Sequence, residues 1–224
     1  MGKHIRILTI QFNTEISSKE TPLFRGAVLK ALGDKANLLY HNHTRERTYR
    51  YSYPLIQYKR IRGKAAIVCI NEGADVINEF LATSGNHYQL GDRSVEMLIE
   101  SVRFNEFEIC LLDKMQPYRI NYWFPLNSHN FEEYMETDSI VMRIQKLEAI
   151  LTSNILSMLK SLDYFIDAQL VVSITNISEP MSVRYKNVKM VSFDVEFMSN
   201  LALPNYIGLG KGVSVGHGIV SKIK

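Results

Sequence analysis

The stretch Gly208-Leu209-Gly210-Lys211-Gly212-Val213-Ser214-Val215-Gly216-His217-Gly218 decides how the rest of the sequence is interpreted. It holds five glycines in eleven residues and is flanked by apolar residues, which is typical of tight turns beside strands. We predict a short strand over residues 213–215, continued by a strand over 218–223. Bare N–H groups around Lys211 suit the phosphates of a nucleic acid. An ordinary glycine-rich hairpin explains the same composition.

Two common phosphate-binding loops do not fit this stretch. A P-loop needs Gly-Lys-Ser or Gly-Lys-Thr at the start of a helix, but Lys211 is followed by Gly212 and little chain remains. The dinucleotide fingerprint G-x-G-x-x-G fails because position 213 is valine. The glycines therefore do not indicate a nucleotide-triphosphate or dinucleotide site.

The spacing instead resembles the signature G-h-G-x5-G-h-G (h, hydrophobic) of the RAMP superfamily of CRISPR-associated proteins. The match is Gly208-Leu209-Gly210, five residues, then Gly216-His217-Gly218, with His217 in the second hydrophobic slot. The loop lies just before a last strand, where the repeat-RNA-cleaving endonucleases of this superfamily (the Cas-six family) carry it. The resemblance implies an α+β fold of two tandem ferredoxin-like (βαββαβ) domains.

Apolar periodicity in the N-terminal half agrees with a ferredoxin-like order. Thr21-Pro22 predicts a helix start, Gly33 its end, and Arg62-Gly63 a turn between two strands. Asn71 is the expected cap of a second helix that closes at Gly85. The predicted elements are, in order, a strand over 3–13, a helix from 21 to 33, strands over 47–58 and 65–70, a helix over 71–85, and a strand or hairpin through 95–111.

The C-terminal half predicts a second, degenerate ferredoxin-like domain. We expect a polar break at 113–117, which divides the chain into domains 1–113 and 114–224. The longest predicted helix is an amphipathic helix from Ser139, capped by Asp138. A short helix over 127–136 precedes it, and strands over 118–124, 170–177 and 188–198 surround it. Residues 198–208 leave no room for a full second helix.

Positive charge is concentrated in one part of the sequence. The chain has 26 basic and 23 acidic residues, a net charge of +3. Between residues 41 and 64, seven basic residues face the single acid Glu46, which leaves 19 basic and 22 acidic residues elsewhere. Such a local stripe predicts a polyanionic partner, with a solvated basic hairpin as the alternative. Its basic members are Arg45, Arg47, Arg50, Lys59, Arg60, Arg62 and Lys64.

Other classes of protein find little support in the sequence. Cys69 and Cys110 lie in apolar strand-like runs, which predicts small core residues rather than a disulfide or a metal site. The start of the sequence does not resemble a signal peptide, and no apolar run approaches the length of a membrane span. We therefore expect a cytoplasmic protein without a membrane partner.

The loop after the first helix carries the candidate chemistry. The resemblance implies a catalytic histidine there, and His41 and His43 occupy that loop beside Arg45 and Arg47. RNA supplies its own 2′-hydroxyl nucleophile, so the protein needs a base, an acid and cations around the phosphate. Imidazole titrates near neutral pH and suits either proton transfer. A metal site and a solvated polar loop are the alternatives, although no third or fourth metal ligand is evident.

Together with the resemblance, these residues predict a metal-independent endoribonuclease without a cofactor, which cuts CRISPR repeat RNA into guide units and leaves a 2′,3′-cyclic phosphate and a 5′-hydroxyl. His41 and His43 are the candidate acid and base in either order, Arg47 the phosphate stabiliser, and Tyr49 a group that orients them. Tyr49, with Tyr51 and Tyr53, could instead stack bases or line a sheet face. The RNA-binding candidates are Arg45, Arg60, Gly208, Gly210, Lys211, Gly212, Gly216 and Gly218.

Two other functions fit parts of the same pattern. A non-catalytic RAMP subunit that holds guide RNA in a CRISPR effector complex would keep the glycine loop without needing the histidine pair. A structural or protein-interaction protein could carry a glycine hairpin by chance. Contacts with other CRISPR-associated effector subunits and a homodimer are left open by the sequence.

Overall fold

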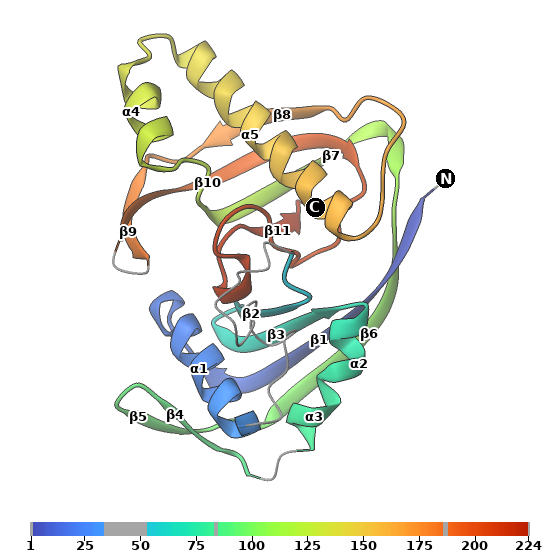
Figure 1. The fold of residues 1–224 in the computed structure, drawn as a ribbon, viewed down its shortest axis with the longest axis vertical. Helices are drawn as coiled ribbons and strands as arrows, with labels where there is room; N and C mark the ends of the chain where they lie inside the picture. Colours follow the sequence, from blue (N-terminus) through green and yellow to red (C-terminus); the bar gives the residue numbers. More distant parts are fainter. Residues whose placement is uncertain (1, 34–52, 83–84, 186–187, 224) are drawn as a thin grey trace, which may run out of the picture. The chain divides into compact units, whose positions relative to one another are not determined.

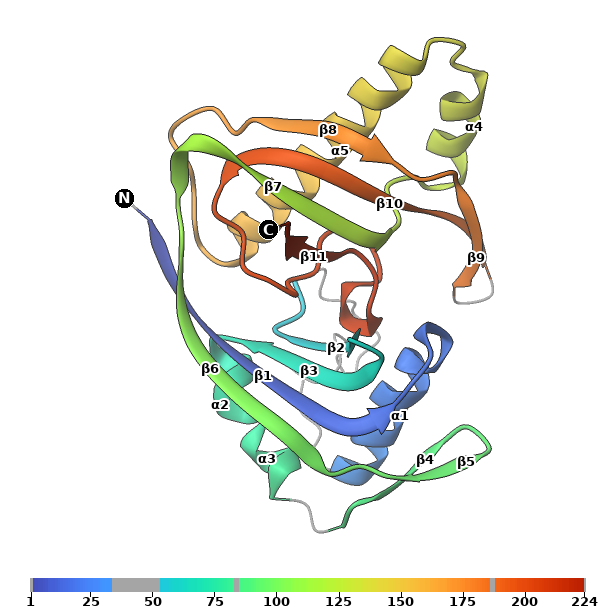
Figure 2. The same ribbon diagram turned by 180° about the vertical axis from the view of Figure 1, so that it is seen from behind.

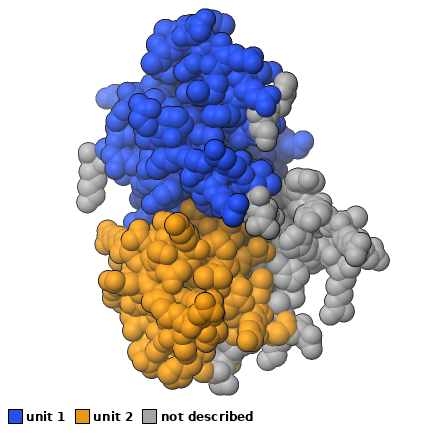
Figure 3. Space-filling model, turned by 90° about the vertical axis from the view of Figure 1, so that its left-hand side faces the viewer, with its two compact units in different colours: residues 1–3, 109–213, 217–224 blue, residues 4–108, 214–216 orange. Residues whose placement is uncertain are grey.

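The computed structural model describes residues 2–33, 53–82, 85–185 and 188–223. The chain divides into two compact units (Figure 3). The first unit comprises residues 4–108 together with 214–216 (orange, marked unit 2 in Figure 3), and the second unit comprises residues 1–3, 109–213 and 217–224 (blue, marked unit 1). A short piece of the C-terminal glycine stretch therefore belongs to the unit formed by the N-terminal half.

The first unit has the ferredoxin-like strand order that the sequence predicts. Its four-stranded sheet runs β2-β3-β1-β6, and β3 pairs antiparallel with both β1 and β2 (Figure 2). A separate hairpin, β4-β5, precedes β6. The elements are β1 (Lys3–Glu15), the 3₁₀-helix η1 (Ser18–Glu20), α1 (Thr21–Leu32), β2 (Ile56–Ile61), β3 (Lys64–Ile70), α2 (Glu72–Val76), α3 (Asn78–Leu81), β4 (His87–Leu90), β5 (Arg93–Glu96) and β6 (Ile99–Ile109).

Helix α1 begins and ends as its sequence predicts. The Ser17 main-chain N–H donates to the Glu20 carboxylate at 2.7 Å in a capping box that starts η1 and leads into Thr21-Pro22. Gly33 ends the helix with φ +53°. The apolar stripe, represented by Phe24, is buried against the sheet, and its ring packs edge-on against Tyr58 at 5.7 Å.

The second unit repeats the same strand order. Its main sheet runs β11-β7-β10-β8, so the first and last strands of the unit are neighbours, as in the first unit. Helix α5 lies across one face of this sheet, and the loop between β10 and β11 takes the place of a second helix (Figure 1). The elements are β7 (Leu111–Trp123), α4 (Ser128–Glu136), α5 (Ile140–Ser161), β8 (Val172–Ile177), β9 (Met181–Tyr185), β10 (Val188–Leu201), the 3₁₀-helix η3 (Val213–Val215) and β11 (Ile219–Lys222).

The predicted helices of this unit are confirmed, with one correction to a cap. The Asn127 side chain caps α4 by accepting the Asn130 N–H at 2.8 Å. Helix α5 is capped by Ser139, whose hydroxyl accepts the Met142 N–H at 3.4 Å, and not by Asp138. Since a cap accepts from the N2 or N3 amide, the side chain immediately before the helix is the one in reach.

Three other expectations were wrong in detail. Residues 113–117 are not a break, because they lie within β7. Asn71 does not cap α2 with its side chain, which instead accepts the Arg6 N–H of β1 at 3.0 Å. Residues 213–215 form η3 rather than a strand, because Gly212 and Gly216 on either side have φ of +76° and +87° and turn the chain out of an extended path.

The structure also bears on the two cysteines and on the expectation that no segment spans a membrane. Cys69 is fully buried in the core of the first unit, and burial raises the pKa of its thiol. Cys110 is half-buried, so its prediction as a core residue holds less well. Among the described residues, no helix is both long and apolar enough to cross a membrane.

Candidate nucleic-acid interface

The glycine loop is anchored at its base by main-chain pairing. The Leu209 N–H donates to the Gly218 carbonyl at 2.8 Å, and the Gly218 N–H donates to the Tyr122 carbonyl of β7 at 3.1 Å. Gly208 forms a β-bridge with Ile219. The two ends of the loop, residues 208–209 and 218–219, are therefore paired with each other, and this pairing continues into β11.

Close packing inside the protein explains the glycines at this base. A Cβ on Gly218 would lie 1.9 Å from the Leu209 carbonyl oxygen, and φ at Gly218 is +64°. A Cβ on Gly208 would lie 2.4 Å from Val213 Cγ1. Both glycines are buried, so they hold the shape of the loop from inside rather than presenting surface to a ligand.

The exposed part of the loop is its tip. Gly210 and Lys211 are exposed, and Gly212 is half-buried. The main-chain N–H groups of Gly210 and Lys211 donate no hydrogen bond to the part of the chain that the structure describes. Free N–H groups beside a lysine match the needs of an anionic ligand. Of the predicted contacts in the loop, Gly210 and Lys211 are the exposed ones.

Gly210 also has a tight neighbour beneath the tip. It has φ +82°, and a Cβ there would lie 2.7 Å from Asn154 Oδ1 and 3.0 Å from Trp123 Nε1. These two atoms are themselves hydrogen-bonded at 2.9 Å, which ties the end of β7 to α5 directly under the loop. The tip therefore rests on a fixed polar contact of the protein.

His217 occupies the second hydrophobic slot of the signature as an aromatic ring. Its imidazole centroid lies 4.2 Å from that of Phe124, and it meets Tyr185 edge-on at 5.4 Å. A Cβ on Gly212 would lie 2.9 Å from His217 Cδ2, so this glycine leaves space for the ring. His217 thus fills the hydrophobic position of the signature by packing as an aromatic ring.

Residues 214–216 of the loop group with the first unit. A Cβ on Gly216 would lie 3.0 Å from Thr21 Cγ2 and 3.4 Å from the Tyr58 carbonyl oxygen. Gly216 therefore lies against the start of α1 and the middle of β2. Nothing in the sequence signals this neighbourhood, because the residues concerned are far apart along the chain.

The described members of the basic stripe do not form a continuous surface. Arg60 and Arg62 are exposed, and Arg60 Nε donates to the Ile16 carbonyl at 2.6 Å, which holds this side chain in place. Lys64 forms an ion pair with Glu100. Lys59 is fully buried. Lys59 is therefore part neither of a surface for a polyanionic partner, as predicted, nor of a solvated hairpin, the alternative, because β2 is buried on both faces along most of its length.

Lys59 is an unusual residue of the first unit. Its Nζ has no hydrogen-bond partner among the described residues, and burial lowers its pKa to about 7. Its neighbour Gln57 is equally buried but donates from Nε2 to the Pro54 carbonyl at 2.9 Å. A lysine with this pKa can be neutral or charged near physiological pH.

The predicted catalytic residues lie outside the described residues: His41, His43, Arg47 and Tyr49, together with the RNA-binding candidate Arg45. Within the described ranges, no group of three or more His, Cys, Asp or Glu side chains could hold a metal ion. The described elements do fix where the histidine segment begins and ends, after Gly33 at the end of α1 and before β2.

Solved structures share this tandem ferredoxin-like architecture. A crystal structure of Cas6b is 30% identical over 99% of this chain and 100% of that one, with a TM-score of 0.87. A crystal structure of the CRISPR RNA processing endoribonuclease Cas6b is 27% identical over 99% and 100% of the two chains, with a TM-score of 0.74. A type IV Cas6 crRNA endonuclease, Csf5, is 14% identical with a TM-score of 0.56 and shares the fold.

Family models cover both halves of the sequence. The Cas6b N-terminal domain matches residues 3–108, and the Cas6b C-terminal domain matches residues 110–223. The chain belongs to the Cas6b family. It is also 39% identical over 124 residues to an uncharacterized protein of Methanocaldococcus jannaschii, a match that spans 55% of this chain and 82% of that protein.

Proposed function

We propose that this protein is an endoribonuclease that cleaves CRISPR repeat RNA into guide units without a catalytic metal. The observation that carries the proposal is the match of both halves to the two Cas6b domains, with a similar solved Cas6b that is a CRISPR RNA processing endoribonuclease. The closed glycine loop with its exposed Lys211 tip supports an RNA partner. The proposed products are a 2′,3′-cyclic phosphate and a 5′-hydroxyl.

The proposed reaction needs two proton transfers at one phosphodiester. One of His41 and His43 takes the proton of the 2′-hydroxyl as its oxygen bonds to phosphorus. The other gives a proton to the 5′-oxygen as the bond from phosphorus to that oxygen breaks. Arg47 stabilises the charge on the phosphate in this step, and Tyr49 orients the reacting groups. All four residues come from the sequence interpretation.

The described residues supply the proposed contacts along the RNA. Lys211 and the N–H groups of Gly210 and Gly212 are assigned to a phosphate, and Arg60 offers a second, fixed cation. Gly208, Gly216 and Gly218 shape the loop in this assignment, because their own neighbours already fill the space around them. Arg45 is assigned to the RNA beside the histidine pair.

The test measures single-turnover cleavage of a repeat RNA oligonucleotide by the full chain. His41→Ala and His43→Ala are each expected to slow cleavage by about 10²–10⁴ with little change in affinity, because each removes one proton transfer. His4→Ala and His87→Ala, at exposed positions of β1 and β4, are the matched controls. A double variant of His41 and His43 that cleaves at the parent rate would remove this segment from the mechanism.

Two changes to the assay test the chemistry itself. Replacing the 2′-hydroxyl at the cut by hydrogen is expected to abolish cleavage and leave binding nearly intact, since the nucleophile is lost. Cleavage is expected to survive excess chelator, and strict dependence on added magnesium would contradict the mechanism. RNA that is bound but never cut, with both histidines present, would instead indicate a guide-RNA-holding subunit.

A further inference from the structure

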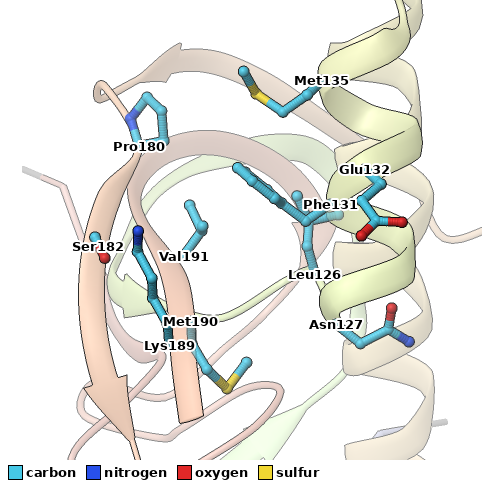
Figure 4. A pocket seen from close by; sticks show the side chains of 10 residues that line it. All are labelled: Leu126, Asn127, Phe131, Glu132, Met135, Pro180, Ser182, Lys189, Met190 and Val191. Carbon is cyan, nitrogen blue, oxygen red and sulfur yellow. The ribbon is translucent and has the colours of Figure 1, made fainter.

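The second unit contains an apolar pocket between α4 and the β9-β10 hairpin. Its volume is about 340 Å³. Phe131 points from α4 toward Val191 of β10, while Met135 lies at the rim near Pro180 (Figure 4). Leu126 and Met190 line the pocket, and both are buried. The pocket therefore offers a preformed place for one large apolar side chain.

Exposed apolar side chains continue from the pocket onto the neighbouring turn. Met135 is 49% exposed at the end of α4, and the first three residues of α5, Ile140, Val141 and Met142, are 70%, 59% and 60% exposed. Consecutive apolar residues at a helix start are unusual on a surface that meets only water. Methionine, present here at 135, 142, 181 and 190, adapts to differently shaped partners and is enriched at interfaces.

This exposed surface is held by fixed contacts. Arg143 Nε donates to the Thr137 carbonyl at 2.6 Å, and one of its terminal nitrogens donates to the Met135 carbonyl at 2.8 Å. The guanidinium lies over the Tyr134 ring, 5.3 Å from its centroid. Lys146 of α5 forms an ion pair with Glu133 of α4. The turn between the helices is thus ordered before any partner binds, which lowers the entropy lost on binding.

The charges around the pocket indicate the charge of the partner that would bind there. Residues 128–139 contain Glu132, Glu133, Glu136 and Asp138 and no lysine or arginine. Glu132 lines the pocket on the α4 side, opposite Lys189 of β10. With Glu133 already paired, three carboxylates remain on the α4 side of this surface. The acidic α4 side repels the phosphates of RNA and attracts lysine and arginine side chains.

We propose that the pocket and the apolar start of α5 form a docking site for another protein. The partner is a segment that inserts one large apolar side chain into the pocket and places basic residues along α4. An amphipathic helix with a basic polar face has this chemistry. No residue of the glycine loop lines the pocket, and the proposal does not depend on RNA cleavage.

The test uses a short fluorescent helical peptide with leucines at i, i+3, i+4 and i+7 and lysines on its other face. Its twin has glutamate in place of lysine. The basic peptide is expected to bind the full chain, and the acidic twin at least about tenfold more weakly. In the variant Met135→Gln/Ile140→Gln, affinity is expected to fall by about tenfold, because neutral polar groups replace apolar contact area.

A matched control lies on the same helix. Leu156 is 43% exposed on α5 but far along the helix from its start, so Leu156→Gln is expected to leave peptide affinity unchanged. All three substitutions are at exposed positions, and melting curves check that each variant folds.

Three results would overturn the proposal. One is equal binding of the basic peptide to the paired variant and to the Leu156 control. Another is displacement of the peptide by repeat RNA whose own affinity falls in the paired variant, which would make this an RNA site. The third is self-association of the parent, seen by sedimentation and lost in the paired variant, which would make the occupant a second copy of this chain.

Discussion

Replacing Lys59 by methionine should stabilise the protein, and more so at low pH. The unfolded lysine titrates near its ordinary pKa of 10.5, whereas burial lowers the folded value to about 7. Between these values the unfolded state binds more protons, so stability rises with pH. Below pH 7 the penalty of burying the charge is fully present, roughly 5 kcal/mol from a pKa difference of about 3.5. At pH 9 about 2 kcal/mol remains.

The assay is urea unfolding of the RNA-free parent and of Lys59→Met at pH 6 and pH 9. The stabilisation by methionine should be about 3 kcal/mol larger at pH 6, because the other titrating groups are common to both proteins and cancel. Lys222→Met, at an exposed position at the end of β11, is the matched control for loss of a lysine. A stability difference for Lys59→Met that is the same at both pH values would refute the burial of an unpaired amine at this position.

Three further substitutions, two of them with a comparison variant, test the loop and the helix cap. Gly218→Ala should destabilise the protein by about 2 kcal/mol or more, because its Cβ would overlap the Leu209 carbonyl. The control Gly26→Ala, which has open space on α1, should stabilise the protein by about 0.5–1 kcal/mol. Equal unfolding midpoints of the two variants would contradict this packing. Lys211→Ala should make the slope of log affinity for repeat RNA against log salt less negative by about 0.7, with no change in melting temperature, and an unchanged slope would show that Lys211 does not contact the RNA. Ser139→Ala should cost about 1 kcal/mol in unfolding and Asp138→Ala much less, and the reverse order would restore Asp138 as the cap.

Local patterns predicted the elements of the fold well. The stripe of α5, the Thr21-Pro22 start and Gly33 end of α1, and the turn at Arg62-Gly63 all depend on neighbouring residues, and the structure has each of them. The strand β9 was not predicted, since it is short and mostly exposed and owes its conformation to pairing with β10. Residues 213–215 were predicted extended because valines favour strands, but the flanking glycines turn the backbone.

The candidate site was predictable in part. The spacing of the glycine pairs predicted a loop before the last strand, and the structure places it there. Which glycines face inward and which face solvent depends on Val213, Leu209 and Asn154, whose approach no local pattern reveals. The burial of Lys59 was missed for a similar reason: a lysine in a strand predicts an exposed face, and tertiary packing overrode that preference. The histidine pair stays a prediction.

The membership of residues 214–216 in the first unit has a consequence for synthesis on the ribosome. Residues 4–108 are made first, but the place beside Thr21 and the Tyr58 carbonyl can be filled only when Gly216 has been made. Likewise one edge of β7 is unpaired until β11 has been made. Neither unit is therefore complete until residues 214–222 have left the exit tunnel. A stalled or shortened product would carry an open sheet edge, a target for degradation by quality-control proteases.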